Sequence, residues 1–169
     1  MIRSATAADA PALCAIYNHF ILQSTVTFEE VAVTPQEMAQ RIDASAGMLP
    51  FLVGEIDGVL AGYAYAAPWK SRSAYRHTVE SSVYVEPGFT GIGLGSRLYQ
   101  ALLQDLRGRG VHAVLAGIAL PNNASVGLHE AFGFAQVGQM REVGRKFDQW
   151  LDVGYWQLLL ARPCANVLS

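Results

Sequence analysis

A glycine-rich segment in the middle of the chain has the composition and spacing of an anion-binding loop. Residues 83–96 read VYVEPGFTGIGLGS, and leucines at every fourth position from Leu94 to Leu106 predict that an amphipathic helix begins inside this segment. The first N–H groups of a helix lack partners within the helix and lie at the positive end of its dipole, and glycines let a bulky anion approach them. A phosphate group would fit there.

A tight turn with close packing between a strand and a helix explains the same glycines equally well. Two kinds of nucleotide site are disfavoured. A P-loop needs Gly-Lys-Ser/Thr, but Gly95 is followed by Ser96 and Arg97. A dinucleotide-binding fold places its glycines after the first strand, with an acidic residue about 20 residues further on. Here three other strand candidates precede the segment, and Asp105 lies inside the helix.

The composition is typical of a globular protein and excludes some partners. With 169 residues, 51% of them hydrophobic, the chain can bury a core, and we expect one domain over 1–169 with a polar tail from about 161. A net charge of −2 gives no field that attracts nucleic acid. No apolar run approaches the ~18 residues of a membrane span, which predicts no membrane partner and a cytoplasmic location. Cys14, expected in the core, and Cys164 lack metal-ligand spacing, and no metal is expected.

Hydrophobic periodicity and turn residues predict the order β-α-α-β-β-β-α-β-α-β-β. A hairpin turn is expected at Asp57-Gly58, and a polar turn around 146–149. The strands are expected at 2–5, 51–56, 59–67, 78–85, 113–120, 134–140 and 150–160. The helices are expected after the cap Thr6, from the cap Thr34 to about Ala46, from the glycine segment past Leu106, and over 123–132.

This order and two motifs resemble the GNAT acetyltransferases. The acyl-CoA motif of that family, Gln/Arg-x-x-Gly-x-Gly/Ala, aligns with residues 90–95, and Thr90 departs from the usual Gln or Arg. Most of the family's phosphate cradle is backbone N–H, so the departure removes at most one side-chain contact. The second motif, Asn-x-x-Ala-x-x-Leu-Tyr-Glu-x-x-Gly-Phe, aligns with residues 122–134, with Ser125 for Ala and His129 for Tyr.

Within that family, the chain is similar to the phosphinothricin and methionine sulfone/sulfoximine N-acetyltransferases. The segments that carry this resemblance extend over nearly the whole chain. They are Ser24-Thr25-Val26, Pro68-Trp69-Lys70, Ala74-Tyr75, Val79-Glu80-Ser81, Leu120-Pro121-Asn122, Leu128-His129-Glu130-Ala131 and Asp152-Val153-Gly154-Tyr155-Trp156-Gln157.

The resemblance implies a GNAT fold of the α/β (α+β) class, with a mixed, mostly antiparallel sheet of about seven strands and helices on both faces. It implies acetyl-CoA as co-substrate, transfer of acetyl to the α-amino group of a small amino-acid-like substrate in a ternary complex, and a homodimer. The acetyl-CoA contacts that it implies are Val83, Tyr84, Val85, Gly91, Ile92, Gly93, Leu94, Gly95, Ser96 and Asn122.

Glu80 is expected to be the general base. If the pantetheine arm pairs with the strand through Val83, the Glu80 carboxylate would lie beside the thioester. A free α-amino group has a pKa of about 8, so the carboxylate need only take the proton, directly or through a water, as the C–N bond forms. A strand residue that faces solvent or forms an ion pair is the alternative.

His129 stands where the family often has the Tyr that protonates the leaving thiolate, and a His can donate that proton near neutral pH. It could equally cap the short helix or contact the CoA chain. Asn122, at the start of that helix, is expected to contact CoA, although helix capping is the commonest use of Asn there.

The loop after Trp69 carries the residues expected to bind the amine substrate, which are Lys70, Ser71 and Arg72, together with Glu80. A carboxylate and a phosphinate or sulfone need cations or donors, and Arg can bind a carboxylate through two parallel hydrogen bonds. Solvated loop charge is the alternative. Aromatic side chains that could wall the pocket, or simply belong to the core, are Phe28, Trp69, Tyr75 and Tyr155.

Three functions remain open from the sequence. The first is an N-acetyltransferase for methionine-derived or phosphinothricin-like amino acids. The second is a GNAT enzyme for another amino acid, a polyamine or a protein N-terminus. The third is an acyl-CoA sensor without catalysis, which Thr90 and His129 keep open and which Glu80 and the second motif disfavour.

Overall fold

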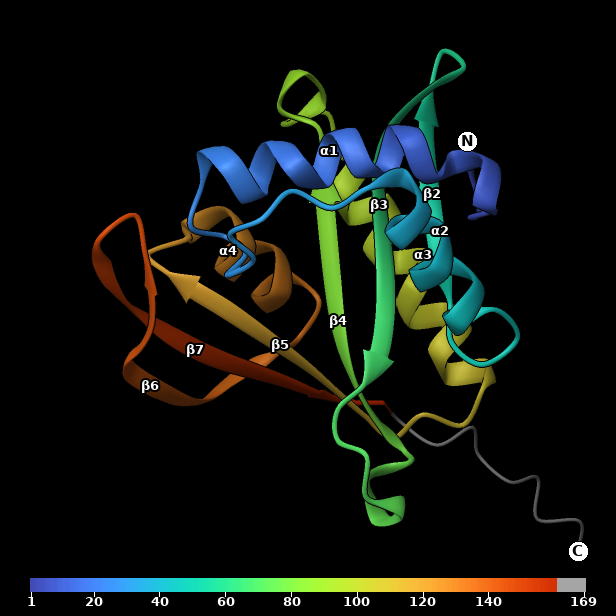
Figure 1. The fold of residues 1–169 in the computed structure, drawn as a ribbon. Coiled ribbons are helices and arrows are strands. Elements are labelled where there is room, and N and C mark those ends of the chain that lie inside the picture. Colours follow the sequence, from blue (N-terminus) through green and yellow to red (C-terminus); the bar gives the residue numbers. More distant parts are fainter. Residues whose placement is uncertain (161–169) are drawn as a thin grey trace, which may run out of the picture.

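A computed structural model describes residues 1–160, so the polar tail expected from about 161, with Cys164, lies outside the described residues. Seven strands form one sheet in the order β1-β2-β3-β4-β5-β7-β6 (Figure 1). The strands are β1 Ile2–Ser4, β2 Phe51–Ile56, β3 Val59–Pro68, β4 Thr78–Val85, β5 Ala113–Leu120, β6 Ala135–Lys146 and β7 Gln149–Leu159. The helices are α1 Ala10–Gln23, α2 Pro35–Ser45, α3 Leu94–Gly108 and α4 Asn123–Ala131. The expected element order and the mixed, mostly antiparallel sheet are confirmed.

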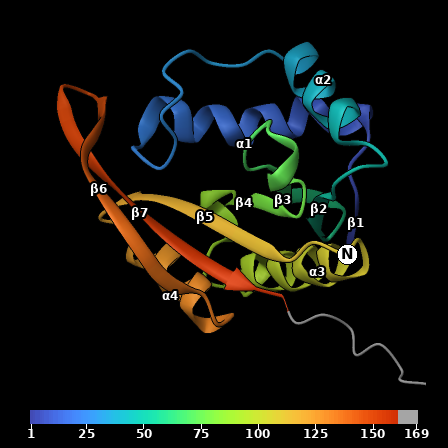
Figure 2. The same cartoon turned by 90° about the horizontal axis from the view of Figure 1, so that it is seen from below.

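Helices cover both faces of the sheet, as expected. Figure 2 shows α1 and α2 on one side and α3 and α4 on the other. The leucine stripe of α3 is fully buried against the sheet: Leu94, Leu98, Leu102 and Leu106 are each 0–1% exposed. On the opposite face, α1 and α2 bury a second core that includes Leu13, Tyr17 and Cys14, the last as predicted.

Two glycines allow close contacts of the central strands with α3 and with β4. Gly54 of β2 and Gly62 of β3 are paired across the strands. A Cβ on Gly54 would lie 2.8 Å from a methyl carbon of Leu94, and one on Gly62 would lie 2.8 Å from the backbone oxygen of Tyr84. Because neither position carries a side chain, the first turn of α3 rests on the strand backbone, which fixes the glycine segment beside the end of β4.

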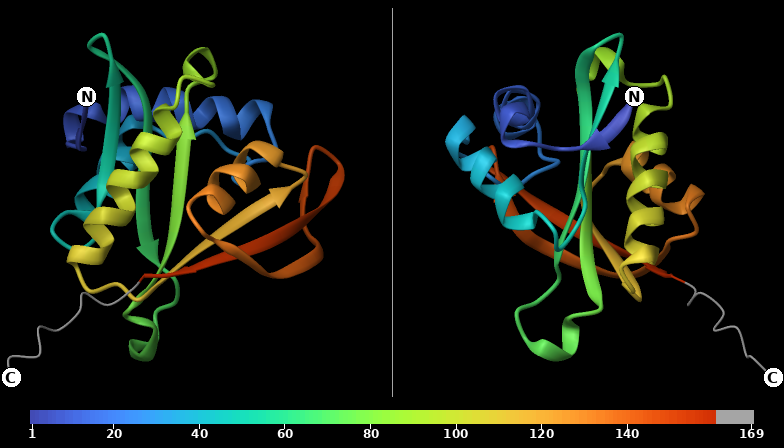
Figure 3. Two further views of the ribbon diagram at one scale, coloured as in Figure 1. Left: turned by 180° about the vertical axis from the view of Figure 1, so that it is seen from behind. Right: turned by 90° about the vertical axis from the view of Figure 1, so that its right-hand side faces the viewer.

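Strands β4 and β5 are parallel neighbours over only a short stretch. Thr78 to Glu80 pair with Ala113 to Leu115, and beyond Glu80 the two strands diverge, as Figures 1 and 3 show. In the described chain, residues 81–85 of β4 are paired with β3 but not with β5. One backbone edge of β4 over 81–85 is therefore available to another extended chain, and we call it the free edge of β4.

The hairpin of β6 and β7 differs from the prediction. The strand expected at 134–140 continues to Lys146, and the turn is Phe147-Asp148, both at positive φ (49° and 59°). Most of β6 is solvent-exposed, so it lacks the apolar alternation that marks a half-buried strand. Lys146, expected in a polar turn, is 2% exposed, and its Nζ donates a hydrogen bond to the backbone oxygen of Thr27 at 2.7 Å.

Smaller differences occur near the N-terminus. The helix expected after Thr6 starts with a 3-10 turn at Ala7–Asp9, and α1 proper begins at Ala10. Within residues 1–160, no helix combines the length and apolar character needed to cross a membrane. In the same part of the chain, no three His, Cys, Asp or Glu side chains gather as metal ligands would.

Candidate active site

A cavity of about 420 Å³ opens in the gap where β4 and β5 diverge, and it is lined mainly by the glycine loop, β4, β5 and α4, with Phe20 of α1 and Val26 on its other side. We call it the glycine-loop cavity. All but one of the residues expected to contact acetyl-CoA line it; they are Val83, Tyr84, Val85, Gly91, Gly93, Leu94, Gly95, Ser96 and Asn122. Ile92 does not line it, and its side chain is 53% exposed.

The glycine loop has the geometry of an anion cradle. Gly91 and Gly93 adopt left-handed φ values of 76° and 78°, which side-chain-bearing residues rarely adopt, and Gly93 is the N-cap of α3. A Cβ at either position would meet nothing within 4 Å, so close packing is not the reason for glycine there. The unpaired N–H groups at the start of α3 can therefore receive a phosphate, as the sequence indicated. Thr90 also lines the cavity, and its hydroxyl donates to the backbone oxygen of Pro87 at 3.0 Å.

A second cavity, of about 680 Å³, lies on the α1 and α2 face of the sheet. We call it the tyrosine cavity, because Tyr17, Tyr63 and Tyr65 form its apolar wall. The strand register places Tyr65 opposite Ser82 and Ala67 opposite Glu80, so this cavity is on the same face of the sheet as the Glu80 side chain.

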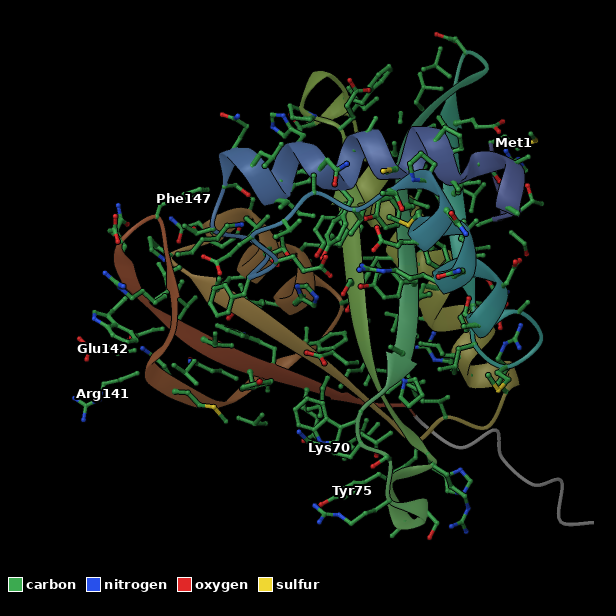
Figure 4. All side chains as sticks on the ribbon, in the orientation of Figure 1. Met1, Lys70, Tyr75, Arg141, Glu142 and Phe147 are labelled. Atoms are coloured by element: carbon green, nitrogen blue, oxygen red, sulfur yellow. The ribbon has the colours of Figure 1, made fainter. Side chains whose placement is uncertain are left out.

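The three loop residues expected to bind the amine substrate, Lys70, Ser71 and Arg72, all line the tyrosine cavity. Figure 4 shows Lys70 and Tyr75 on the loop that leaves the end of β3. The Lys70 ammonium lies 4.6 Å from the centre of the Trp69 ring, and the Arg72 guanidinium lies 5.8 Å from that of Tyr75. These stacked positions keep both charges at the cavity mouth.

Arg41 of α2 also lines the tyrosine cavity, which the sequence did not suggest. Its guanidinium donates to both carboxylate oxygens of Glu29, at 3.0 and 3.2 Å. Because Glu29 balances this charge, Arg41 is less suited than Lys70 and Arg72 to bind an anionic substrate group.

Glu80 occupies the point where β4 and β5 part. It is the last residue of β4 that is paired with β5, and its strand neighbours Val79 and Ser81 line the tyrosine cavity and the glycine-loop cavity, respectively. Glu80 itself lines neither cavity. Burial raises the pKa of its carboxyl group above the ordinary value, while the positive charge of Lys70 and a backbone hydrogen bond from Gly117 act in the opposite direction. A carboxylate with a raised pKa is a stronger proton acceptor.

Two of the four candidate wall aromatics lie together near Glu80. The rings of Trp69 and Tyr155 meet edge to face, with centres 5.6 Å apart. Burial raises the pKa of the Tyr155 hydroxyl, and the charge of Glu80 adds to that shift. None of the four candidate aromatics lines either cavity, and the Phe28 ring lies directly against Gly144 of β6.

His129 lines the glycine-loop cavity but is only 3% exposed. Its Nδ1 lies 2.7 Å from the backbone oxygen of Ser125, an acceptor that requires a proton on Nδ1. Its Nε2 is buried and has no partner among the described residues, and burial lowers the pKa of the ring. A neutral ring with its proton on Nδ1 has no proton to give from Nε2, so this geometry favours a structural role over proton donation.

Asn122 serves the capping role that the sequence left open, and it also lines the glycine-loop cavity. Its side-chain oxygen accepts a hydrogen bond from the Ser125 backbone N–H at 3.1 Å, which caps α4. The amide nitrogen remains as a possible donor for a ligand in the cavity.

The two cavities lie on either side of Glu80, and one of them carries a loop suited to a phosphate group, an arrangement that suits an enzyme with two substrates. Residues 2–154 match the family model described as an acetyltransferase (GNAT) domain. The chain belongs to the GNAT family and is an acetyl-CoA-dependent N-acetyltransferase.

Three relatives illustrate the similarity. The phosphinothricin N-acetyltransferase of Streptomyces viridochromogenes is 49% identical over 156 residues, which cover 92% of this chain and 85% of the relative. The L-methionine sulfoximine/L-methionine sulfone acetyltransferase of Salmonella typhimurium is 40% identical, with 97% and 96% covered. A phosphinothricin acetyltransferase of Sinorhizobium meliloti, whose structure is a complex with acetyl-CoA, superposes with a TM-score of 0.93 at 34% identity and covers 98% of this chain and 90% of that one.

Proposed function

We propose that this enzyme transfers acetyl from acetyl-CoA to the α-amino group of a small amino-acid-like substrate of the phosphinothricin, methionine sulfone or methionine sulfoximine type. The names of the relatives support this substrate class. The observation that carries the mechanism is the position of Glu80 at the end of the β4–β5 pairing, between a cavity suited to acetyl-CoA and a cavity suited to an amine. We assign the whole chain, 1–169, to a single GNAT domain.

In the proposed complex, the CoA pyrophosphate lies at the N-terminus of α3, and the pantetheine arm pairs with the free edge of β4 as an added strand would. A backbone N–H of Val83 to Val85 can then hold the thioester oxygen as it becomes an oxyanion. The amine enters from the tyrosine cavity and attacks the thioester carbon. Glu80 accepts the amine proton, directly or through a water, while the C–N bond forms and the C–S bond breaks to release CoA.

The role of His129 can be tested by a near-isosteric change. We expect His129→Phe to keep kcat within about threefold of the wild-type value, because the ring nitrogens face Ser125 and the protein interior rather than the thioester. Steady-state kinetics from pH 6 to 9 would measure this. A loss of about 10²-fold or more, typical of a missing acid or base, would instead identify His129 as the proton donor to the leaving thiolate.

Arg72 is proposed to bind the carboxylate of the amine substrate. Arg72→Ala is expected to raise the substrate KM by about 10-fold or more, because a charge-assisted hydrogen bond contributes about 1.5–3 kcal/mol. The KM for acetyl-CoA should change little, since Arg72 lines the tyrosine cavity and not the glycine-loop cavity. Equal increases in both KM values would indicate a folding or loop defect rather than a lost substrate contact.

We also propose that the enzyme is a cytoplasmic homodimer that uses the β6 and β7 hairpin. Strand β6 is the last strand of the sheet, and exposed apolar side chains gather on the hairpin: Val137, Met140, Val143, Phe147 and Trp150 are each 49–62% exposed. Figure 4 shows Arg141 and Glu142 projecting outward from the same strand. A long edge strand with apolar side chains is suited to a subunit contact. Sedimentation equilibrium would test this, and a monomer at micromolar concentration would contradict it.

A second candidate keeps the reaction and changes the amine. The tyrosine cavity is large and mostly apolar, which favours an amino acid with a bulkier apolar side chain than methionine sulfone. The cations Lys70 and Arg72 at its mouth disfavour a polyamine. Acetyl-CoA-dependent thiol release should be measured with phosphinothricin, methionine sulfone, methionine sulfoximine, ordinary amino acids, spermidine and a short peptide. Turnover confined to the first three supports the proposal; CoA binding without any turnover would favour a sensor.

A further inference from the structure

We propose that Gly117 of β5 is a positioning residue for the reaction, because the absence of a side chain there sets where the carboxylate of Glu80 lies. The inference rests on the proposed function, in which Glu80 accepts the amine proton. Neither motif of the family includes Gly117, and its link to Glu80 comes only from the three-dimensional arrangement.

The carboxylate of Glu80 fills the space that a side chain at residue 117 would take. A Cβ built on Gly117 would lie 2.9 Å from Oε1 of Glu80 and 3.3 Å from Cε1 of Tyr155. Glu80 is paired with Leu115, two residues before Gly117 on the parallel strand, and Gly117 is paired with Tyr155 of β7. The Glu80 side chain therefore lies across the point where β4 and β5 begin to diverge. Its carboxylate ends over Gly117, beside the Tyr155 ring.

Backbone conformation and core packing do not require glycine at this position, which also lines the glycine-loop cavity. Gly117 does not adopt a left-handed φ, so its backbone conformation is open to any residue. It is exposed, and the three atoms nearest to a Cβ there belong to Glu80 and Tyr155, so core packing does not demand a small residue. Glycine weakens a strand, and in a strand it often marks a close approach of another group. Here that group is the carboxylate of Glu80.

Gly117 also acts on the charge of Glu80. A backbone hydrogen bond from Gly117 stabilises the carboxylate and opposes the effect of burial on its pKa. A methyl group at residue 117 would displace the carboxylate, because the end of the Glu80 side chain is the nearest group and moves more readily than the strand backbone. Displacement changes the distance to the amine and weakens this hydrogen bond.

The test is Gly117→Ala, with Gly108→Ala as the control. Gly108 is an exposed glycine at the end of α3, away from both cavities, where a Cβ would meet nothing within 4 Å. We expect Gly117→Ala to lower kcat by about 10-fold or more, as the misplacement of a catalytic group does. The KM for acetyl-CoA should stay near the wild-type value; a rise in this KM as large as the fall in kcat would mean that the methyl group meets CoA in the cavity that Gly117 lines, and would contradict a role through Glu80. The Tm should stay near the wild-type value, and the control should behave as wild type. In a Glu80→Gln background, Gly117→Ala should cause no further loss of kcat, because its effect acts through Glu80.

A readout that does not need turnover separates this inference from the proposed function. In protein labelled with ¹³C at the Glu carboxyl carbons, the Glu80 resonance is assigned by its loss in Glu80→Gln and titrated by NMR. We expect the Glu80 pKa to rise in Gly117→Ala, because the hydrogen bond that favours the charged form is weakened. An unchanged Glu80 titration, or an equal loss of kcat in the Glu80→Gln background, would overturn the role of Gly117. If no amine is a substrate, the proposed function fails while the titration still decides this inference.

Discussion

Replacing Glu80 by Gln is expected to lower kcat by about 10²- to 10⁴-fold, the range of a lost general base. Gln keeps the size of the side chain but cannot accept the amine proton near neutral pH. The KM for acetyl-CoA should stay within about twofold, because the residues proposed to bind it are the glycine loop and the free edge of β4, and Glu80 does not line that cavity. Thiol release under saturating acetyl-CoA measures the effect directly.

The pH profile gives the same prediction a second readout. The base must be deprotonated to work, so activity falls as pH decreases through the pKa of Glu80. Since burial raises that pKa, the acid limb of kcat/KM should lie above the range of an ordinary Glu, and it should be absent from the residual activity of Glu80→Gln. Glu86→Gln, which changes a carboxylate close by in sequence that lines neither cavity, is the control and should match the wild type. Wild-type kcat in Glu80→Gln from pH 6 to 9 would remove Glu80 from the mechanism.

Gly62→Ala is expected to have the largest effect on stability. The added Cβ would lie 2.8 Å from the backbone oxygen of Tyr84, and a strand backbone cannot move away as a side-chain tip can. Overpacking of this kind costs about 1–3 kcal/mol, which lowers the Tm of a chain this long by about 2–12 °C. Because Gly62 is paired with Val85 on β4, the strain acts on the free edge of β4, and the affinity for acetyl-CoA should fall as well.

Thermal unfolding and calorimetric titration with CoA would measure both effects of Gly62→Ala. Gly108→Ala again serves as the control, because it adds the same methyl group at a position where it meets nothing. Wild-type Tm and CoA affinity in Gly62→Ala would show that β4 can shift without cost. The close approach of β3 to Tyr84 would then not be what fixes the free edge.

Short sequence patterns were enough to predict the elements whose conformation depends mainly on neighbouring residues. The four leucines of α3 repeat at the helical period and are all buried. The strands expected at 78–85 and 113–120 have the same bounds in the structure, and the turn at Asp57-Gly58 has positive φ at both residues. The glycine loop could also be predicted, because left-handed φ values at the start of a helix favour glycine.

Relations between distant segments could not be read from the sequence. The contact of Glu80 with Gly117 and Tyr155 depends on where β4 and β5 part, and no local pattern encodes that point. The ion pair of Arg41 and Glu29 joins α2 to the loop before it. The buried Lys146 donates a hydrogen bond to the backbone oxygen of Thr27, which is far away in the sequence. The role of His129 depends on the tautomer set by Ser125 and on burial, neither of which its residue type reveals.

The central claim is that acetyl-CoA and the amine occupy the two separate cavities and meet beside Glu80. A crystal structure of the enzyme with CoA and an accepted amine would test it most directly. We expect the pyrophosphate at the N-terminus of α3, the pantetheine arm along the free edge of β4, and the amine nitrogen within direct or water-mediated hydrogen-bond reach of the Glu80 carboxylate. A pantetheine arm that runs elsewhere, or an amine bound out of reach of Glu80, would contradict it.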